Sequence, residues 1–327
     1  MTRLPYSQDD IEQMAKELLR MEPDPIPRFI LLKEFMHLKP TEAAYKRAYE
    51  KVLAHPFVVK LEKEQTSHGY WGHFHVDTEA MIQRCLSIGL APEHPCLSSA
   101  VAFIEKVLKG EDIWHQRCEK QDNPRWWLEM FMPLVSAASL SLIHPNHPLL
   151  DKHIEVWERF AQAAWATGEY RLEQEKQRQI DYFKINTKRI IPFYNYYAVL
   201  FLTSRKEILE ASLDKKILSY CLQKKDGMYY IYDNQASVPV PINDTKCFYH
   251  WLRLLTILSR FQSWEGSSHS YCRWIWKQRN ETGFWDLGKK PRGWYFPLSD
   301  SWRIEKNRII DSSIFVLRLL KQDAAAR

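Results

Sequence analysis

The segment from Trp126 to Ile143, WWLEMFMPLVSAASLSLI, has Glu129 as its single charged residue. A helix with so little polar surface must be covered on all sides, whereas a striped helix faces water on one side. Three further segments are nearly as apolar: Ile190–Leu202, Cys247–Leu258 and Ile309–Leu320. We therefore predict a set of fully buried helices.

Amphipathic segments with one charged face alternate with these buried segments, as in Leu149–Trp165 and Lys206–Gln223. The alternation predicts an all-α protein in which an inner ring of buried helices is surrounded by an outer ring that faces solvent. The inner helices recur about every 47 to 63 residues, which is the period of a repeated helical hairpin. We expect inner helices to begin near Ile26, Asp77, Pro124, Lys188, Asp244 and Asn307, and outer helices near Thr41, Pro95, His147, Lys206 and Gly266.

The N-terminus supplies a sixth outer helix. Ser7 and Asp10 have the spacing of a capping box, which predicts an amphipathic helix through about Arg20. We expect this helix to pack outside the last inner helix, which ends near Leu320, so that the two ends of the chain close the ring. The sequence thus predicts an (α/α)6 toroid of six inner and six outer helices, formed by residues 1–327 as one domain.

Residues that cap or initiate helices mark the predicted starts. Asn123 stands before Pro124, and Asp77 and Asp244 occupy N-cap positions of two inner helices. His-Pro pairs introduce three outer helices, at His55, His94 and His147. We interpret these histidines as helix-entry residues and not as metal ligands.

The net charge of +6 comes from interspersed basic and acidic residues. This pattern is compatible with an anionic ligand and does not indicate a nucleic-acid-binding surface. The 13 Trp and 16 Tyr indicate either large aromatic residues in the core or an aromatic-lined cavity. The 45% hydrophobic content is sufficient for a large core.

The six cysteines form no Cys-x-x-Cys pair, and most lie in apolar segments, so we expect buried reduced thiols. The N-terminal residues lack the apolar stretch of a signal peptide. No uninterrupted apolar run reaches the roughly 18–20 residues of a membrane span. We therefore expect a cytoplasmic protein without a transmembrane segment, although contact with a membrane surface stays compatible with the sequence.

The turns from outer to inner helices carry a second repeat, a Gly followed by an aromatic residue. It occurs in HGYWG (68–72), DGMYY (226–230) and TGFW (282–285), and more weakly in TGEY (167–170). The Gly provides the positive φ that ends the outer helix, and the aromatic side chain fills the gap between neighbouring hairpins.

At these turns the chain resembles the prenyltransferase and squalene-cyclase repeat family, in which an amphipathic helix is followed by a Gln, a Gly-x-Trp turn and a buried helix. The best copy is QTSHGYWG (65–72), followed by Asp77-Thr78-Glu79-Ala80 and a helix through Leu90. The resemblance covers most of the chain as architecture. It implies a toroid whose central cavity holds the function.

Class II cyclases of that family protonate an alkene with an Asp-x-Asp-Asp motif where an inner helix begins. The nearest match here, His75-Val76-Asp77-Thr78, keeps only the Asp at the proton-donating position. The resemblance implies that Asp77 is the catalytic acid and that His75, His73 and the helix N-terminus stabilise its conjugate base. The alternative is that Asp77 is only an N-cap.

The spacing of acidic residues and cysteines disfavours metal chemistry. Class I terpene synthases use Asp-Asp-x-x-Asp, and the adjacent pair here, Asp9-Asp10, lies on the exterior N-terminal helix. Protein prenyltransferases bind zinc through Asp-x-Cys and a later His, whereas Asp244 and Cys247 are three residues apart and no suitable His follows. We expect no metal and no cofactor.

Further candidates for substrate binding lie at the turns or near the starts of inner helices, where they could converge at one mouth of the toroid. They are Arg28, Tyr70, Trp71, Asp122, Arg125, Trp126, Arg189, Tyr194, Asn195, Asp244, His250, Arg308 and Asp311. An Arg beside the positive end of a helix dipole needs an Asp or an anionic ligand to compensate its charge. Arg308 with Asp311, and Asp122 with Arg125, could equally form local i,i+3 pairs.

These patterns favour an isoprenoid-handling, cyclase-like enzyme that acts by metal-independent protonation on a polyprenyl substrate. Its aromatic-lined cavity would stabilise carbocations through cation–π contacts, and its partner would be a small apolar or diphosphate-bearing molecule. The alternatives are a carbohydrate-active α/α toroid, a lyase or hydrolase of an acidic glycan, and a non-catalytic repeat protein that binds a lipid or a partner. A lining of apolar aromatics favours isoprenoids, and a polar groove with paired carboxylates favours glycans.

Overall fold

A computed structural model describes residues 4–73, 76–115, 123–185, 189–228, 231–289 and 297–324, without the side chains of residues 73 to 77. The described chain is built from helices α1 to α14. They are accompanied by a short antiparallel hairpin of β1 (Gly72–His73) and β2 (Val76–Asp77). The predicted all-α class is therefore confirmed.

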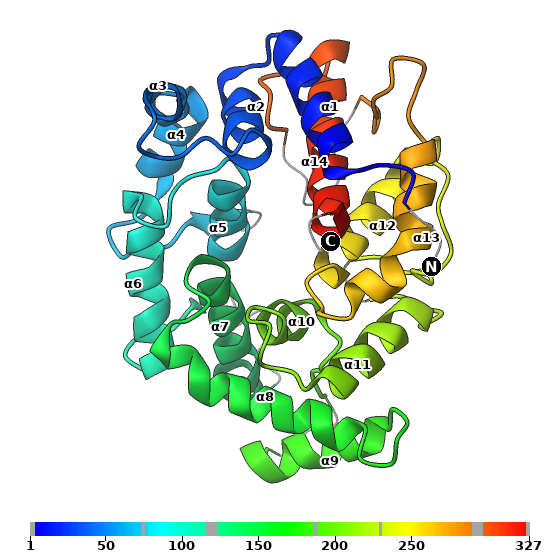
Figure 1. The fold of residues 1–327 in the computed structure, drawn as a ribbon. Helices are drawn as coiled ribbons and strands as arrows, with labels where there is room; N and C mark the ends of the chain where they lie inside the picture. Colours follow the sequence, from blue (N-terminus) through cyan, green and yellow to red (C-terminus); the bar gives the residue numbers. More distant parts are fainter. Residues whose placement is uncertain are drawn as a thin grey trace.

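The predicted buried helices are found as a connected set. They are α2 (Pro25–Ile30) with the π-helical turn η1 (Leu31–Phe35), α5 (Thr78–Ser87), η3 (Trp126–Phe131) with α7 (Met132–Ile143), α10 (Tyr196–Leu202), α12 (Thr245–Leu258) and α14 (Glu305–Ala324). Contacts link α5 to α7, α7 to α10, α10 to α12, α12 to α14 and α14 to α2. In Figure 1, α5, α7, α10, α12 and α14 lie toward the middle of the view.

The amphipathic helices lie mostly nearer the rim of the same view (Figure 1). They are α1 (Gln8–Arg20), α3 (Ala43–Leu53), α4 (Pro56–Glu64), α6 (Pro95–Lys109), η4 (Pro148–Leu150) with α8 (Asp151–Ala164), α9 (Leu172–Phe183), α11 (Ala211–Gln223) and α13 (Trp264–Lys277). Among them, α6 packs on α7, α8 packs on α10 and α13 packs on α14. Each of these three amphipathic helices therefore covers a buried one.

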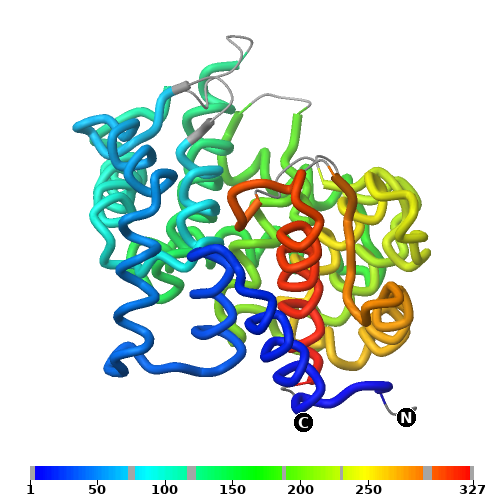
Figure 2. Tube along the Cα trace, turned by 90° about the horizontal axis from the view of Figure 1, so that it is seen from above, coloured from blue at the N-terminus to red at the C-terminus, as the bar shows by residue number. Residues whose placement is uncertain are grey.

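The two ends of the chain meet as expected. Asp10 N–H donates to Ser7 Oγ at 3.2 Å, and Ser7 N–H donates to the Asp10 carboxylate at 2.7 Å, so the predicted capping box starts α1. Helix α1 contacts α14 through a face that includes the buried Ile11, Ala15 and Leu18. Figure 2 shows α1 in blue beside α14 in red.

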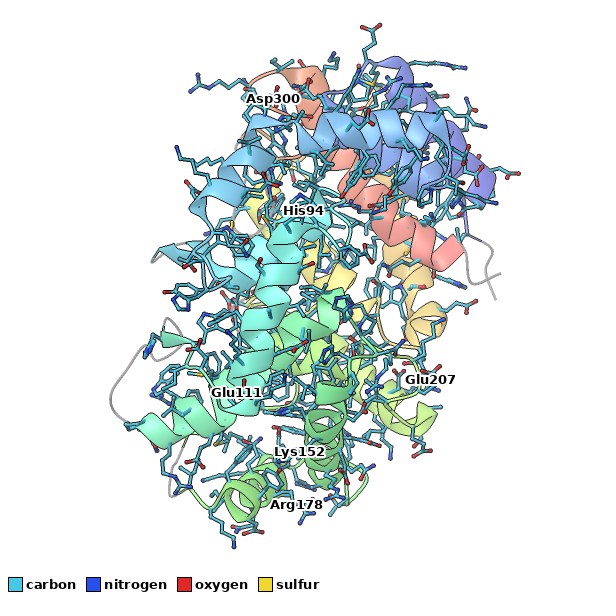
Figure 3. All side chains as sticks on the ribbon, turned by 90° about the vertical axis from the view of Figure 1, so that its left-hand side faces the viewer. His94, Glu111, Lys152, Arg178, Glu207 and Asp300 are labelled. Carbon is cyan, nitrogen blue, oxygen red and sulfur yellow. The ribbon has the colours of Figure 1, made fainter. Side chains whose placement is uncertain are left out.

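All three His-Pro pairs cap a helix in the same way. The Nδ1 atoms of His55, His94 and His147 accept from the backbone N–H two residues later, at 3.2, 3.3 and 3.3 Å. Since Nδ1 is an acceptor, the neutral ring carries its proton on Nε2. His55 Nε2 hydrogen-bonds to the Asp300 carboxylate at 2.8 Å, and His147 Nε2 hydrogen-bonds to the Glu105 carboxylate of α6 at 3.0 Å. His94 Nε2 lies 3.4 Å from the Glu62 carboxylate of α4. Figure 3 shows His94 at the start of α6. The interpretation of these histidines as helix-entry residues is confirmed, and each cap also ties its helix to a neighbour.

The Gly-aromatic turns have the predicted backbone. Gly69, Gly168, Gly227 and Gly283 have φ values of 92°, 91°, 60° and 83°. In two of these turns the following Trp is fully buried, as Trp71 and Trp285. The positive φ lets the chain reverse so that this ring can enter the core.

Trp71 and Trp285 make the same two hydrogen bonds. Each indole Nε1 donates at 2.9 Å to the carbonyl ten residues earlier, that of Leu61 and that of Ile275. Each backbone N–H donates to a hydroxyl of the next buried helix, Thr78 of α5 at 3.0 Å and Ser313 of α14 at 3.3 Å. The two Trp residues therefore fasten an outer helix to the following inner helix.

Some helix boundaries differ from the predicted ones. The outer helix expected from Thr41 is divided into α3 and α4, because His55 caps a new helix at Pro56. The inner helix expected from Lys188 begins at Tyr196, because Asn195 is its N-cap. The outer helix expected from Lys206 begins at Ala211, and α9, which packs on α8, is absent from the predicted set.

The buried apolar side chains form one cluster that extends along the chain from Leu4 to Leu320. In the described residues, Trp126–Ile143 is the one segment long and apolar enough to span a membrane, and 72% of it is buried inside the protein. A core helix passes the same test, so this part of the chain has no clear transmembrane segment. Four cysteines are buried free thiols as expected, namely Cys85, Cys96, Cys221 and Cys272; Cys247 is half-buried, and Cys118 lies outside the described residues.

Candidate functional site

The sequence singles out Asp77 and His75 as the catalytic pair. The backbone of Asp77 pairs with Gly72 in the β1–β2 hairpin, directly before α5. The side chains of Asp77 and His73 lie outside the described residues, as do the whole of His75 and Asp122. Their proposed roles stay predictions.

Several of the other candidates serve the core. Trp71 fastens two helices, and Tyr70 packs its half-buried ring on Phe103 with centroids 5.2 Å apart. Trp126 is buried, and its indole donates to the carbonyl of Arg189 at 3.1 Å. The guanidinium of Arg189 lies 4.8 Å from the centroid of the Trp126 ring, so the structure brings these two candidates together.

Two candidates are helix caps. Asn195 Oδ1 accepts from the N–H groups of Tyr197 and Ala198 at 2.9 and 3.1 Å. Asp244 Oδ1 accepts from Cys247 N–H at 3.2 Å, which confirms the predicted N-cap of α12. In both residues a side-chain oxygen is therefore engaged in capping the N-terminus of a helix.

Tyr194 belongs to an aromatic cluster with Tyr170 and Tyr220, at centroid distances of 5.6 and 5.4 Å. His250 is half-buried on α12, and burial lowers its pKa. Arg28 is exposed on α2.

Arg125 and Arg308 each pair with a carboxylate other than the one expected, and Asp122, the expected partner of Arg125, lies outside the described residues. Arg125 is exposed and makes a bidentate pair with Glu129, at 2.6 and 2.9 Å. Arg308 makes a bidentate pair with Asp286, at 2.6 and 2.8 Å, so the predicted Arg308–Asp311 pair is wrong. The reason is that the segment before α14 folds back over this helix. Asp311, which is fully buried, instead accepts from the Leu298 and Ser299 N–H groups, the Ser299 hydroxyl and the Trp302 indole.

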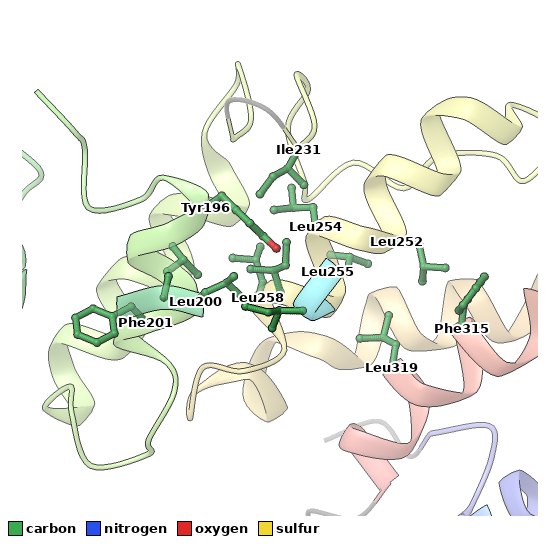
Figure 4. Packing of buried hydrophobic residues seen from close by; sticks show 14 of the residues in the cluster. Tyr196, Leu200, Phe201, Ile231, Leu252, Leu254, Leu255, Leu258, Phe315 and Leu319 are labelled. Carbon is green, nitrogen blue, oxygen red and sulfur yellow. The ribbon is translucent and has the colours of Figure 1, made fainter. Parts of the chain in front are cut away.

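A cavity of about 260 Å³ lies among the buried helices. Its walls come from α5, α7, α10, α12 and α14 and from the residues directly after α12. The lining residues are Gln83, Ser87, Leu142, Tyr196, Leu200, Arg253, Thr256, Ile257, Arg260, Phe315 and Arg318. Figure 4 shows Tyr196 and Leu200 of α10 on one side of the leucines of α12, and Phe315 of α14 on the other.

Much of the cavity lining lies toward the C-terminal ends of the buried helices, although Tyr196 is the first residue of α10. Ser87 is the last residue of α5, Leu142 lies in the last turn of α7, and Arg260 follows the end of α12. The sequence instead places the candidates where inner helices begin. Only two of the lining side chains, Tyr196 and Phe315, are aromatic, so the expected aromatic lining is not found in this cavity.

Three guanidinium groups line this cavity, and none of its described lining residues is acidic. Arg318 is held by Glu34 of η1 through hydrogen bonds of 2.7 and 2.6 Å. The guanidinium of Arg253 lies 5.1 Å from the centroid of the Tyr196 ring. Arg260 donates from Nε to Thr203 Oγ1 at 3.3 Å, and burial lowers its pKa.

A buried carboxylate, Glu79 of α5, acts on Tyr196 of the cavity lining. It is 2% exposed and accepts from the Tyr197 hydroxyl at 2.8 Å. Burial raises the pKa of Tyr196, and the charge of Glu79 adds to this rise while Arg253 opposes it. Tyr196 therefore faces the cavity with a protonated hydroxyl, which can donate to a ligand.

Two of the cavity residues carry a signal in the sequence, although the predicted site does not include them. Arg253 and Arg318 each stand inside a predicted buried helix, CFYHWLRLLTIL and IIDSSIFVLRLL. A charged side chain in a helix that is covered on all sides needs a partner or a polar cavity. An isolated Arg in such a segment therefore indicates an internal site.

Glu62, His94 and Cys96 form a second cluster, with ligand atoms within 4.8 Å of one another. The His94 cap places the ring proton on Nε2, and a protonated nitrogen is not a metal ligand. Burial, with a contribution from Glu62, raises the pKa of the Cys96 thiol to about 11, which keeps it protonated. We therefore interpret this cluster as a helix cap, like those at His55 and His147.

The chain matches no protein-family model, no curated protein and no solved structure. Its function must therefore be sought in the geometry and chemistry of the cavity.

Proposed function

We propose that the protein is an (α/α)6 toroid whose central cavity binds a small, partly apolar molecule of the isoprenoid class. The observation that carries this proposal is the cavity of about 260 Å³, because its walls come from five buried helices that contact one another in chain order. The contact between α1 and α14 supports closure of the ring. A concave site that combines apolar walls with a few polar groups is the usual form of a small-molecule site.

The lining supports an amphipathic ligand. Leu142, Leu200, Ile257 and Phe315 provide apolar surface for a branched hydrocarbon. Gln83, Ser87, Thr256 and Tyr196 add hydrogen-bonding groups. The repeated Trp71 and Trp285 hydrogen bonds support the resemblance to the prenyltransferase and squalene-cyclase repeat family.

A cyclase-like reaction at Asp77 is carried over from the resemblance as part of the proposal. Asp77 directly precedes α5, and Gln83 of the same helix lines the cavity, about 9 Å further along the helix axis. The acidic-glycan alternative is less well supported. It needs paired carboxylates, and the described lining of this cavity has none.

Binding tests the proposal directly. Native mass spectrometry with prenyl alcohols and diphosphates, from isopentenyl to farnesyl, should detect a one-to-one complex. Leu142→Trp replaces a lining side chain by a larger one that fills part of the cavity, so binding should weaken about tenfold or more. The matched control is Leu172→Trp, because Leu172 is 44% exposed on α9. Absence of any isoprenoid complex, or equal binding by a folded Leu142→Trp variant, would overturn the proposal.

Turnover tests the role of Asp77 separately. As an N-cap, Asp77→Asn should cost little stability, because Asn caps about as well as Asp. As a proton donor, the same change should abolish turnover, because an amide cannot deliver that proton. A variant that melts normally and still converts an isoprenoid at the wild-type rate would show that Asp77 is only a cap.

A further inference from the structure

The charges around the cavity do not balance. Arg253, Arg260 and Arg318 face it, and Arg318 is neutralised by its bidentate pair with Glu34. Glu79 is the second carboxylate in this region, since its charge acts on Tyr196, the residue over which Arg253 lies. Lys33 and Lys321 also act on Glu34, so the cationic groups around the cavity outnumber these two carboxylates.

Arg260 contributes to this excess. Its hydrogen bond within the described residues goes to the neutral hydroxyl of Thr203, and none of the described ion pairs includes it. The carbonyl groups at the end of α12, two residues earlier, supply only about half a negative charge. A cation held in such a place is stabilised when a ligand brings the missing charge.

We infer that the ligand of this cavity carries an acidic group, a carboxylate bound by Arg260, attached to an apolar body that packs on Leu200, Ile257 and Phe315. This inference rests on the proposed function and specifies its ligand. A carboxylate needs one guanidinium group as its anchor, and Arg260 supplies it. Carboxylate and guanidinium also match geometrically, because two parallel N–H groups can reach the two oxygens.

Three ligands with the same ten-carbon body separate the possibilities: geranic acid, geraniol and geranyl diphosphate. Isothermal titration should show that geranic acid binds about tenfold or more tightly than geraniol, the gain expected for a charge-assisted hydrogen bond. Geranyl diphosphate should bind no more tightly than the acid. In Arg260→Met the affinity for geranic acid should fall to that for geraniol, whereas Arg260→Lys should retain most of the preference.

Arg159→Met is the matched control, because Arg159 lies on α8 in an exposed pair with Glu155. It should leave all three affinities unchanged, and thermal unfolding of each variant should establish that it is folded. Equal binding of geraniol and geranic acid by the wild type would overturn the acidic group while leaving the proposed function intact. Tighter binding of the diphosphate, lost in Arg260→Met, would overturn the assignment to a carboxylate. Failure of all three to bind would overturn both proposals.

Discussion

Gly69 and Gly283 occupy equivalent turns, but only one of them lies against another helix. A Cβ atom added at Gly69 would lie 2.1 Å from the carbonyl oxygen of Ser99 in α6, whereas one added at Gly283 would have no atom within 4 Å. Both residues have a positive φ, of 92° and 83°. The substitutions Gly69→Ala and Gly283→Ala therefore separate the cost of the backbone conformation from the cost of close packing.

The backbone cost should be similar in the two variants. An Ala in the left-handed region costs about 1–2 kcal/mol, of which about 0.4–1 kcal/mol is offset because Ala has less freedom than Gly in the unfolded chain. Gly283→Ala should therefore lose about 1 kcal/mol. Gly69→Ala must in addition move its turn away from α6, and such overpacking costs about 1–3 kcal/mol more.

Urea-induced unfolding followed by circular dichroism gives both free energies of unfolding. We expect Gly69→Ala to be less stable than Gly283→Ala by about 2 kcal/mol. Equal losses would refute the reasoning, because they would show that the approach of α6 does not restrict residue 69.

Three further perturbations test the contacts between helices. Burial lowers the pKa of His94 in the folded protein below its ordinary value of 6.5. The neutral ring therefore stabilises the fold above pH 6.5, and this stabilisation is lost as the pH falls through the lower folded pKa. Urea midpoints measured from about pH 8 to about pH 5 should fall more steeply for the wild type than for His94→Asn, because Asn caps the helix without titrating. Glu34→Gln should lower the free energy of unfolding by about 1–2 kcal/mol, because it weakens a partly exposed bidentate pair with Arg318; an unchanged urea midpoint would show that the pair contributes nothing. Trp285→Phe should lower the free energy of unfolding by about 2–3 kcal/mol, because it leaves the buried carbonyl of Ile275 without its indole donor, and Trp71→Phe should have a similar effect at Leu61. Clearly different losses of stability for the two variants in denaturant titrations would argue against an equivalent role.

The features that were predictable from the sequence are those that neighbouring residues determine. A His before a Pro, or an Asp directly before an apolar helical segment, caps the helix that follows it whatever the rest of the protein does. For this reason the caps at His55, His94, His147 and Asp244 were predicted correctly. The same applies to the positive φ of the Gly turns and to the capping box of α1.

The features that were not predictable depend on segments far apart in the sequence. Arg308 lies three residues from Asp311 but pairs with Asp286. The reason is that the Asp311 carboxylate already accepts four hydrogen bonds from the loop before α14. The cavity could not be located because its walls come from five helices. Only the isolated charges of Arg253 and Arg318 in apolar segments pointed to it.

The bidentate pair between Glu34 and Arg318 joins residues that are 284 positions apart in the chain. Helix α14 also contacts α1 and α2, which are synthesised well before it. At a translation rate of about 5–20 residues per second, the N-terminal helices wait roughly 15 to 60 seconds on the ribosome before their partner helix is synthesised. During that interval the apolar face of α1 is open to other chains and to chaperones. The segment with α1 therefore needs shielding until α14 has been synthesised, and faster elongation should raise the yield of folded protein.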